Sequence, residues 1–197
     1  AGIKQVYSIQ FNAEKKTAMN LITQNAYTGV DTAQTGGFRG SGILAEVQDN
    51  GCEFMHPDLT QMDYTDGSVE VNYHGTCTSG IVFGTGAGNI DAQGIAYQAV
   101  GAFCDWGKGR AASIQRLWTG TFNEGSSGMN GVVQSNSWFQ GGCDGQYTAL
   151  SAEVDSAMVT YPKVLTFWCA ANSNYGTGEG VISQDSAELN NAYHAGG

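Results

Sequence analysis

Four short apolar segments recur along the chain, and the stretches between them have helical character. The apolar segments cover residues 42–48, 95–104, 132–138 and 164–170. The helical stretches cover residues 13–25, 74–84, 111–117 and 148–161. Strands that alternate with helices predict βαβ units, and therefore an α/β fold whose mainly parallel central sheet is flanked by helices in three layers. In such a sheet, the functional groups gather at the carboxyl ends of the strands.

The composition predicts a globular chain and excludes several classes of partner. Of the 197 residues, 41% are hydrophobic and only 13% are charged, which is typical of a packed domain and not of a disordered segment. The formal net charge of −10 argues against nucleic acid or an anionic membrane as a partner. No apolar run has the length of a membrane-spanning helix. An acidic, lysine-poor chain that contains cysteines is compatible with a secreted, extracellular protein.

The five cysteines leave their pairing open. They are Cys52, Cys77, Cys104, Cys143 and Cys169, and no two of them form a Cys-x-x-Cys motif. This spacing argues against a zinc site or a thioredoxin-like redox motif. Because the number is odd, one thiol is free or is paired outside this chain.

One of the apolar segments and one of the helical stretches carry chemistry at their ends. The strand at 42–48 is followed directly by Asp49, and the helix at 74–84 begins with His74 in a His-Gly-Thr sequence. Taken alone, Asp49-Asn50-Gly51 is a hairpin-turn sequence, and a lone His74 is more often a helix-start or core residue. A His-Pro-Asp-Leu block at 56–59 lies between them. A carboxylate and an imidazole in this setting are two parts of a nucleophile-activating site.

The order and content of these blocks resemble the subtilisin-like serine proteases, or subtilases. That family has an aspartate block followed by His-Pro-Asp-Leu, then a His-Gly-Thr-x-x-x-Gly block. Three further blocks of the family are echoed here by residues 94–97, 136–139 and 169–172. The resemblance spans roughly residues 40–176 in the family's order. The sequence departs from the family's pattern at Tyr97, Phe139 and Ala171, and these departures concern the substrate cleft more than the fold.

The resemblance implies a subtilisin-like fold and a role for each matching residue. Asp49 and His74 would be the acid and base of an Asp-His-Ser triad, and Asn172 would donate a hydrogen bond to the oxyanion. The residues that would lie along the polypeptide substrate are Ser137, Trp138 and Phe139. A structural calcium ion would be bound by Asp58 together with the loop around Asn89, because hard cations take carboxylate and carbonyl oxygens.

The nucleophilic serine is the part that the sequence does not supply. None of the serines lies in a Gly-Thr-Ser or a Gly-x-Ser-x-Gly block. The prediction is that residues 1–197 form the N-terminal part of a single catalytic domain, that Gly197 is a processing point, and that a second chain or a removed segment carries the serine. Two alternatives stay open: a catalytically inactive subtilase-like module that binds peptides, and a cysteine hydrolase that uses Cys77 or Cys169 with His74.

Some stretches of the sequence give weaker or conflicting signals. Residues 60–73 are polar and predict irregular backbone, residues 35–40 predict a loop, and residues 124–128 predict a flexible segment. Glu46 and Gln48 lie on one face of the first strand, which is unusual for a strand that is buried on both sides.

Overall fold

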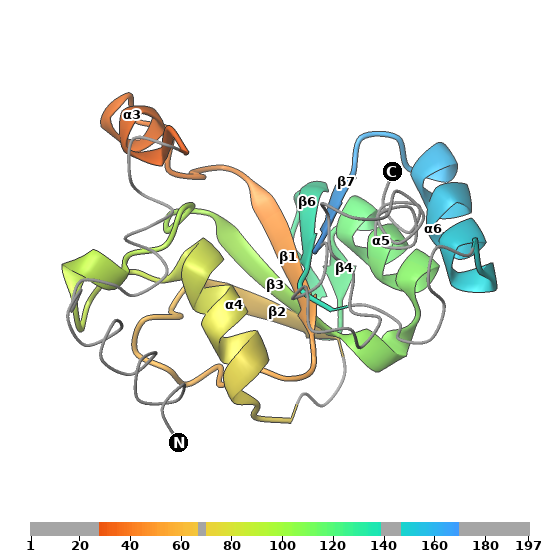
Figure 1. The fold of residues 1–197 in the computed structure, drawn as a ribbon, viewed down its shortest axis with the longest axis horizontal. Coiled ribbons are helices and arrows are strands. Elements are labelled where there is room, and N and C mark those ends of the chain that lie inside the picture. The colour runs from red at the N-terminus through yellow and green to blue at the C-terminus, as the bar shows by residue number, and fades with distance from the viewer. Residues whose placement is uncertain (1–27, 67–69, 139–146, 170–197) are drawn as a thin grey trace, which may run out of the picture.

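The computed structural model describes residues 28–66, 70–138 and 147–169 (Figure 1). Its larger elements are α3 (Val30–Thr35), β1 (Leu44–Asp49), β2 (Met62–Asp66), α4 (Tyr73–Phe83), β3 (Val100–Asp105), α5 (Arg110–Thr119), β6 (Gly131–Asn136), α6 (Ala149–Thr160) and β7 (Leu165–Trp168). The shorter ones are two 3₁₀ turns, Ile90–Ala92 and Trp106–Lys108, and a small antiparallel pair, β4 (Thr121–Phe122) and β5 (Gly125–Ser126). The helix predicted at 13–25 lies outside the described residues.

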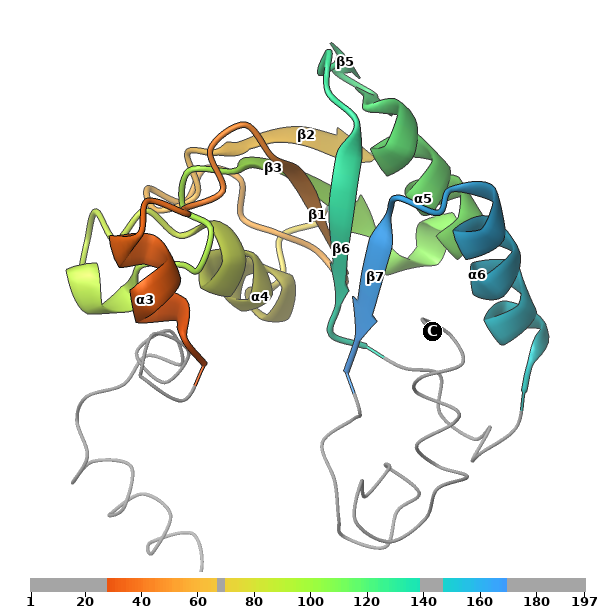
Figure 2. The ribbon, with the colours of Figure 1, turned by 90° about the horizontal axis from the view of Figure 1, so that it is seen from above.

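A five-stranded parallel sheet forms the centre of the molecule. Its strand order is β2-β3-β1-β6-β7, so β1 occupies the middle. Helix α4 lies on one face of the sheet, and α5 and α6 lie together on the other (Figures 1 and 2). This arrangement confirms the predicted α/β class with its three layers and mainly parallel sheet. All the strands point the same way, so Asp49 pairs with Asp105 of β3 at their common carboxyl end.

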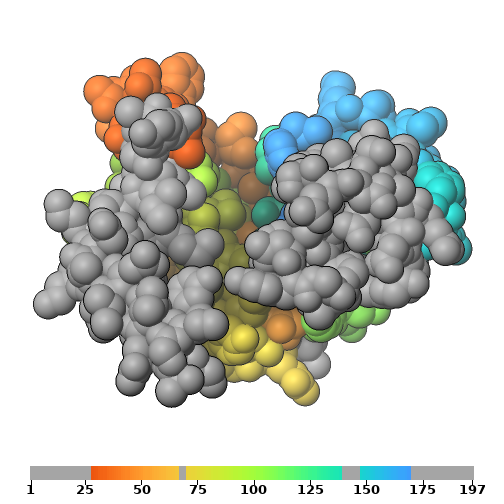
Figure 3. Space-filling model, in the orientation of Figure 1, coloured from red at the N-terminus to blue at the C-terminus, as the bar shows by residue number. Residues whose placement is uncertain are grey.

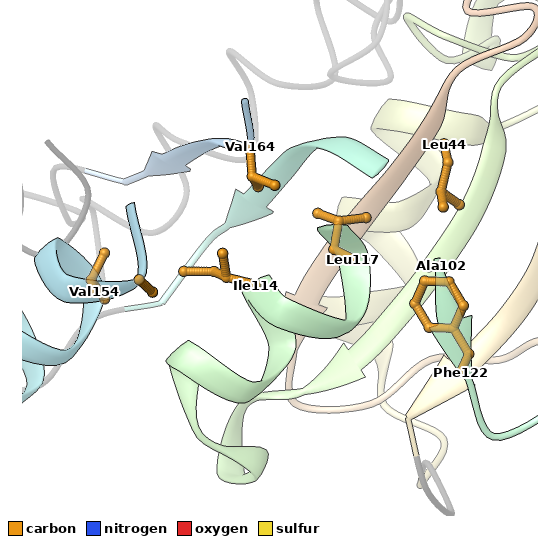
Figure 4. Close-up of a cluster of buried hydrophobic side chains, with 8 residues drawn as sticks. Leu44, Ala102, Ile114, Leu117, Phe122, Val154 and Val164 are labelled. Carbon is orange, nitrogen blue, oxygen red and sulfur yellow. The ribbon is translucent and has the colours of Figure 1, made fainter. Parts of the chain in front are cut away.

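Alternating residues of β1 supply the two hydrophobic cores. Leu44 faces α5 and packs in a cluster with Ala102, Ile114 and Leu117 (Figure 4). Ala45 and Val47 belong to the second cluster, on the α4 side; this cluster also contains Leu59, Phe83 and Phe103. The period-two alternation of a strand that is covered on both faces explains why β1 and its neighbour β3 read as apolar segments.

One element of the sheet was not predicted. Strand β2 lies inside the stretch 60–73, for which the sequence predicted irregular backbone. Its residues pair with β3, and Tyr64 stacks on Phe122 with ring centroids 5.1 Å apart. The strand is therefore stabilised by partners that are distant in the sequence and that compensate for the low strand propensity of Asp63 and Asp66.

The predicted strand at 95–104 is too long at its start. Only Val100–Asp105 is a strand. The N–H groups of Ile95 and Ala96 donate instead to the carbonyls of Ile81 and Val82 in α4, at 2.9 and 2.8 Å. The loop predicted at 35–40 is confirmed for residues 36–40, because α3 ends at Thr35. The prediction at 124–128 missed a short element, because residues 125–126 form β5.

The side of the sheet that faces α5 contains a fully buried polar layer. Glu46 and Gln48 are 1% and 0% exposed. The Nε2 atom of Gln134 donates to Oε1 of Glu46 at 2.7 Å, and Asn136 Nδ2 donates to Gln134 Oε1 at 3.1 Å. Glu46 is thus paired with a polar residue of β6, whereas the Gln48 amide donates to Sγ of Cys104 in β3 at 3.6 Å, which explains how a doubly covered strand accommodates both.

The outer strand β7 has one buried face and one open face. Val164, just before it, and Thr166 are buried, whereas Leu165 and Phe167 are 51% and 54% exposed. The described residues of α3 and of the β7–α6 region stand on opposite flanks of the molecule, and α4 lies between them (Figure 3). The apolar face of β7 is therefore left without a covering helix among the described residues.

Candidate active site

The acid and the base predicted from the sequence lie next to each other. Asp49 is the last residue of β1, and His74 is the second residue of α4. The side chain of Asn72 caps this helix by accepting a hydrogen bond from the backbone N–H of His74 at 3.0 Å. The strand end and the helix start together bring Nδ1 of His74 to 2.8 Å from Oδ1 of Asp49.

Two glycines allow the helix to approach the strand end. A Cβ atom on Gly75 would lie 2.0 Å from the carbonyl oxygen of Gly51, and 3.1 Å from the Cβ of Asp49. Gly51 itself has φ +135°, and a Cβ there would lie 2.1 Å from the carbonyl oxygen of Glu70. Only glycine fits at either position without moving the backbone.

Replacing Gly75 by Ala should therefore push α4 away from β1 and destabilise the fold. We expect the free energy of unfolding to fall by about 1–3 kcal/mol, as is typical of overpacking, measured by urea denaturation. Gly80→Ala is the matched control on the same helix, because a Cβ there meets nothing within 4 Å. Equal stability of the two variants would contradict the close approach.

The carboxylate of Asp49 is buried and fully engaged, whereas the imidazole is accessible. The Asp49 side chain is 0% exposed and that of His74 is 41% exposed. Besides Nδ1 of His74, Oδ1 of Asp49 accepts from the backbone N–H of Asn50 at 2.8 Å. Oδ2 accepts from the hydroxyl of Thr78 at 2.9 Å. None of the described residues forms a hydrogen bond with the second imidazole nitrogen, Nε2, so that nitrogen is open to a substrate or to another segment.

The structure places two of the three predicted substrate-binding residues just beyond β6. Ser137 is half-buried, and Trp138 is only 7% exposed. The indole of Trp138 packs edge-on against Trp168 and Trp106, with centroids 5.0 and 6.1 Å away, and Arg110 lies over its ring. The side chain of Trp138 is thus part of the core, and only its main chain remains for a substrate. Phe139 and Asn172 lie outside the described residues.

The predicted calcium ligands occupy one loop region but have different local roles. Oδ1 of Asp58 accepts hydrogen bonds from the Thr85 hydroxyl at 3.0 Å and from the Gly88 N–H at 3.3 Å. Burial raises the pKa of Asp58, but these hydrogen bonds outweigh it and hold the pKa below its usual range. The Asn89 side chain caps the turn at 90–92 by accepting from the Asp91 N–H. In the described part of the chain, no group of three or more His, Cys, Asp or Glu side chains is arranged to hold a metal.

The calcium site stays a prediction with a direct test. If an ion binds between Asp58 and the 86–91 loop, EDTA should lower the melting temperature of the protein and added Ca²⁺ should restore it. Asp58→Asn should remove that dependence, whereas Asp63→Asn on the exposed side of β2 should keep it. Melting that is insensitive to the chelator would exclude the site.

The cysteines offer no partner for His74 among the described residues. Cys77 is exposed one helical turn after His74, but no hydrogen bond joins the two side chains. Cys169 is partly buried at the end of β7. Cys52 and Cys104 are buried, and burial raises the pKa of Cys52 to about 11. A thiol with a raised pKa is a poor nucleophile at neutral pH.

Comparisons with known proteins give a fold and no family. The sequence matches no family model and no curated protein. The α/β architecture with its parallel sheet is one that occurs in proteases. A solved example is the CspB protease of Clostridium perfringens, which is similar with a TM-score of 0.51 at 17% sequence identity. The match covers 69% of this chain and 37% of that chain, so this chain spans well under half of that structure. At this identity, the likeness shows a shared fold alone.

None of the described helices is long and apolar enough to cross a membrane.

Proposed function

We propose that this protein is a subtilisin-like serine peptidase whose acid and base lie on this chain. The observation that carries the proposal is the pairing of buried Asp49 with accessible His74, at 2.8 Å, at the carboxyl end of a parallel sheet. A structural role alone explains the burial of the carboxylate. It does not explain why the imidazole is 41% exposed at the edge where α/β proteins bind their substrates.

The chemistry follows from that geometry. Asp49 holds His74 in the tautomer that carries its proton on Nδ1, so Nε2 is a proton acceptor. His74 takes the proton from a serine hydroxyl as the serine oxygen attacks the scissile carbonyl carbon. It then returns that proton to the leaving amine as the C–N bond breaks. Asn172 would donate to the oxyanion, an interaction typically worth about 2.7–4 kcal/mol. The substrate backbone would pair beside residues 137–139.

The serine is proposed to come from a segment outside these 197 residues. The open apolar face of β7, with Leu165 and Phe167 half-exposed, supports this proposal, since proteins rarely leave such a face uncovered. A further segment that packs on this face would also stand near the carboxyl ends of the strands. The second chain and the secreted location remain parts of the proposal.

A fluorophosphonate probe tests the proposal in the full-length protein. We expect covalent labelling of one serine beyond Gly197, loss of labelling in His74→Ala, and hydrolysis of an unstructured peptide. Peptide mapping by mass spectrometry locates the labelled serine, and a label within residues 1–197 would contradict the proposed second segment.

Other outcomes assign the protein to a different class. Inactivation by a thiol-alkylating agent, with indifference to the fluorophosphonate, would indicate a cysteine hydrolase. Saturable peptide binding without hydrolysis or labelling would indicate an inactive peptide-binding module.

A further inference from the structure

Thr78 holds the carboxylate oxygen of Asp49 that does not bind His74. Its hydroxyl lies 2.9 Å from Oδ2, whereas Nδ1 of His74 lies 2.8 Å from Oδ1. We propose that Thr78 is a positioning residue: it fixes the plane of the Asp49 carboxylate and thereby the tautomer and orientation of the His74 ring. Its catalytic meaning rests on the proposed function, but the positioning itself is a property of the fold.

The helix makes this arrangement possible. His74 and Thr78 are four residues apart in α4, so their side chains lie on the same face of the helix, one turn apart. Gly75 faces the same strand end without a side chain, which lets both donors reach Asp49. Helix α4 therefore supplies a hydrogen-bond partner to each oxygen of the Asp49 carboxylate, which lies at the end of β1.

Both contacts are needed to define the direction of the hydrogen bond to His74. The terminal torsion of an aspartate is broad, so a carboxylate held at one oxygen can turn about its Cβ–Cγ bond. The Asn50 N–H also binds Oδ1, which leaves Thr78 as the only described donor to Oδ2. Without the hydroxyl, Oδ2 would be buried without a donor, and the carboxylate would turn or admit water.

A purely local role for the hydroxyl is the competing explanation. Oγ1 of Thr78 also lies 3.1 Å from the Gly75 carbonyl oxygen, a back-bond that helical threonines often form. A hydroxyl has one proton, and a charged acceptor forms the stronger hydrogen bond. The geometry therefore favours Asp49, at the shorter distance, and the two acceptors predict different effects of mutation.

Three variants of the full-length protein separate these explanations. Thr78→Val removes the hydroxyl with little change of shape, and Thr78→Ser keeps the hydroxyl and removes the methyl group. Thr119→Val is the matched control, because the Thr119 hydroxyl makes a back-bond to Arg116 in α5 and contacts no carboxylate. The readout is ¹⁵N and ¹H NMR of the histidine rings at mildly alkaline pH, which reports the tautomer of His74 and the exchange rate of its Nδ1 proton. Thermal unfolding is measured alongside.

We expect the Nδ1 proton of His74 to be protected in the wild type, in Thr78→Ser and in Thr119→Val. In Thr78→Val, its exchange should be at least roughly ten times faster, as loss of one charged hydrogen bond predicts. Where the protein hydrolyses a peptide, kcat should fall by a similar factor with KM unchanged. If Thr78→Val does not fold, Thr78→Ala provides the same deletion.

Unchanged exchange in Thr78→Val, or equal loss in Thr78→Ser and Thr78→Val, would overturn the inference. The NMR result decides the matter even if the wild-type protein hydrolyses no peptide, so failure of the proposed function and failure of this inference are distinguishable.

Discussion

Asp49→Asn is expected to lower kcat for peptide hydrolysis by about 10⁴-fold, the loss seen when the acid of a Ser-His-Asp triad is replaced by its amide in another fold. The amide has nearly the volume of the carboxylate, so the fold should survive. Asn50 N–H and the Thr78 hydroxyl both need acceptors, and an amide provides only one oxygen. Its NH₂ group would therefore compete with Nδ1–H and favour the wrong tautomer of His74.

The measurement is steady-state hydrolysis of an unstructured peptide by the full-length protein. Asp63→Asn is the control, because Asp63 is exposed on β2 and contacts no part of the site. Unfolding temperatures of both variants establish that any loss is chemical. An Asp49→Asn enzyme with wild-type kcat would show that this pair does not act as acid and base, and the proposed function would fall with it.

The pair was predictable from the sequence only together with the blocks around it. Local pattern alone favoured a turn at Asp49 and a structural role for His74. The pair was predicted because the surrounding blocks occur in the order of the subtilases, and a strand end and a helix start meet at one edge of a parallel sheet. The contribution of Thr78 was not identified in this way. Its only signal is the four-residue spacing from His74, which matters once Asp49 is known to lie against that face of α4.

The fold was predictable where local and distant interactions agree. Helix α6 matches its predicted range of 148–161 closely, because Thr148 and Ser151 form a capping box and Val154 and Ala157 face the core. Strand β2 was missed because its stability comes from pairing with β3 and not from its own residues. The segment at 95–99 is apolar like a strand, but the backbone N–H groups of Ile95 and Ala96 donate to α4 and not to a neighbouring strand. Neither outcome has a signal in the local sequence.

The polar residues of β1 differ most from the apolar pattern expected of a strand that is covered on both faces. Glu46 and Gln48 occupy positions where a strand covered on both faces normally has aliphatic residues. Glu46 is accommodated because β6 places Gln134 opposite it, in register, and Gln48 because its amide donates to Cys104 of β3. Such pairing depends on which strands become neighbours, and the sequence of one strand does not reveal it.

Buried Glu46 should make the stability of this protein fall as pH rises. Burial raises the pKa of Glu46 from an ordinary value of 4.5 to about 8, although the hydrogen bond from Gln134 and the charge of Arg116 oppose the shift. The charge of Asp66 also raises the pKa of Glu46, by a smaller amount. Cys104 lies between Asp66 and Gln48 in the same buried layer. The protonated acid suits the site, because Oε2 of Glu46 has no donor among the described residues, and neither do the side-chain oxygens of its neighbours Gln48 and Asn136.

The direction in which stability changes with pH follows from proton binding by Glu46. Between pH 4.5 and about 8 the folded state keeps the Glu46 proton that the unfolded chain has lost, so stability is greatest at low pH and declines through this window. At about 1.4 kcal/mol per pH unit, the free energy of unfolding should fall by on the order of 4–5 kcal/mol. Glu46→Gln keeps an oxygen for Gln134 and places an NH₂ where the acid carries its proton. The variant should therefore lose this decline.

Urea denaturation of the full-length protein from pH 5 to pH 9 provides the measurement, with the wild-type curve subtracted from that of Glu46→Gln so that other titrating groups cancel. The difference should be near zero at the acid end and should rise to several kcal/mol in favour of the variant at the alkaline end. Glu70→Gln, at an exposed glutamate, is the control and should follow the wild type throughout. Parallel curves for Glu46→Gln and the wild type would mean that Glu46 is charged in the folded protein. In that case the buried layer would have to contain a donor or cation for Oε2 other than the carboxyl proton.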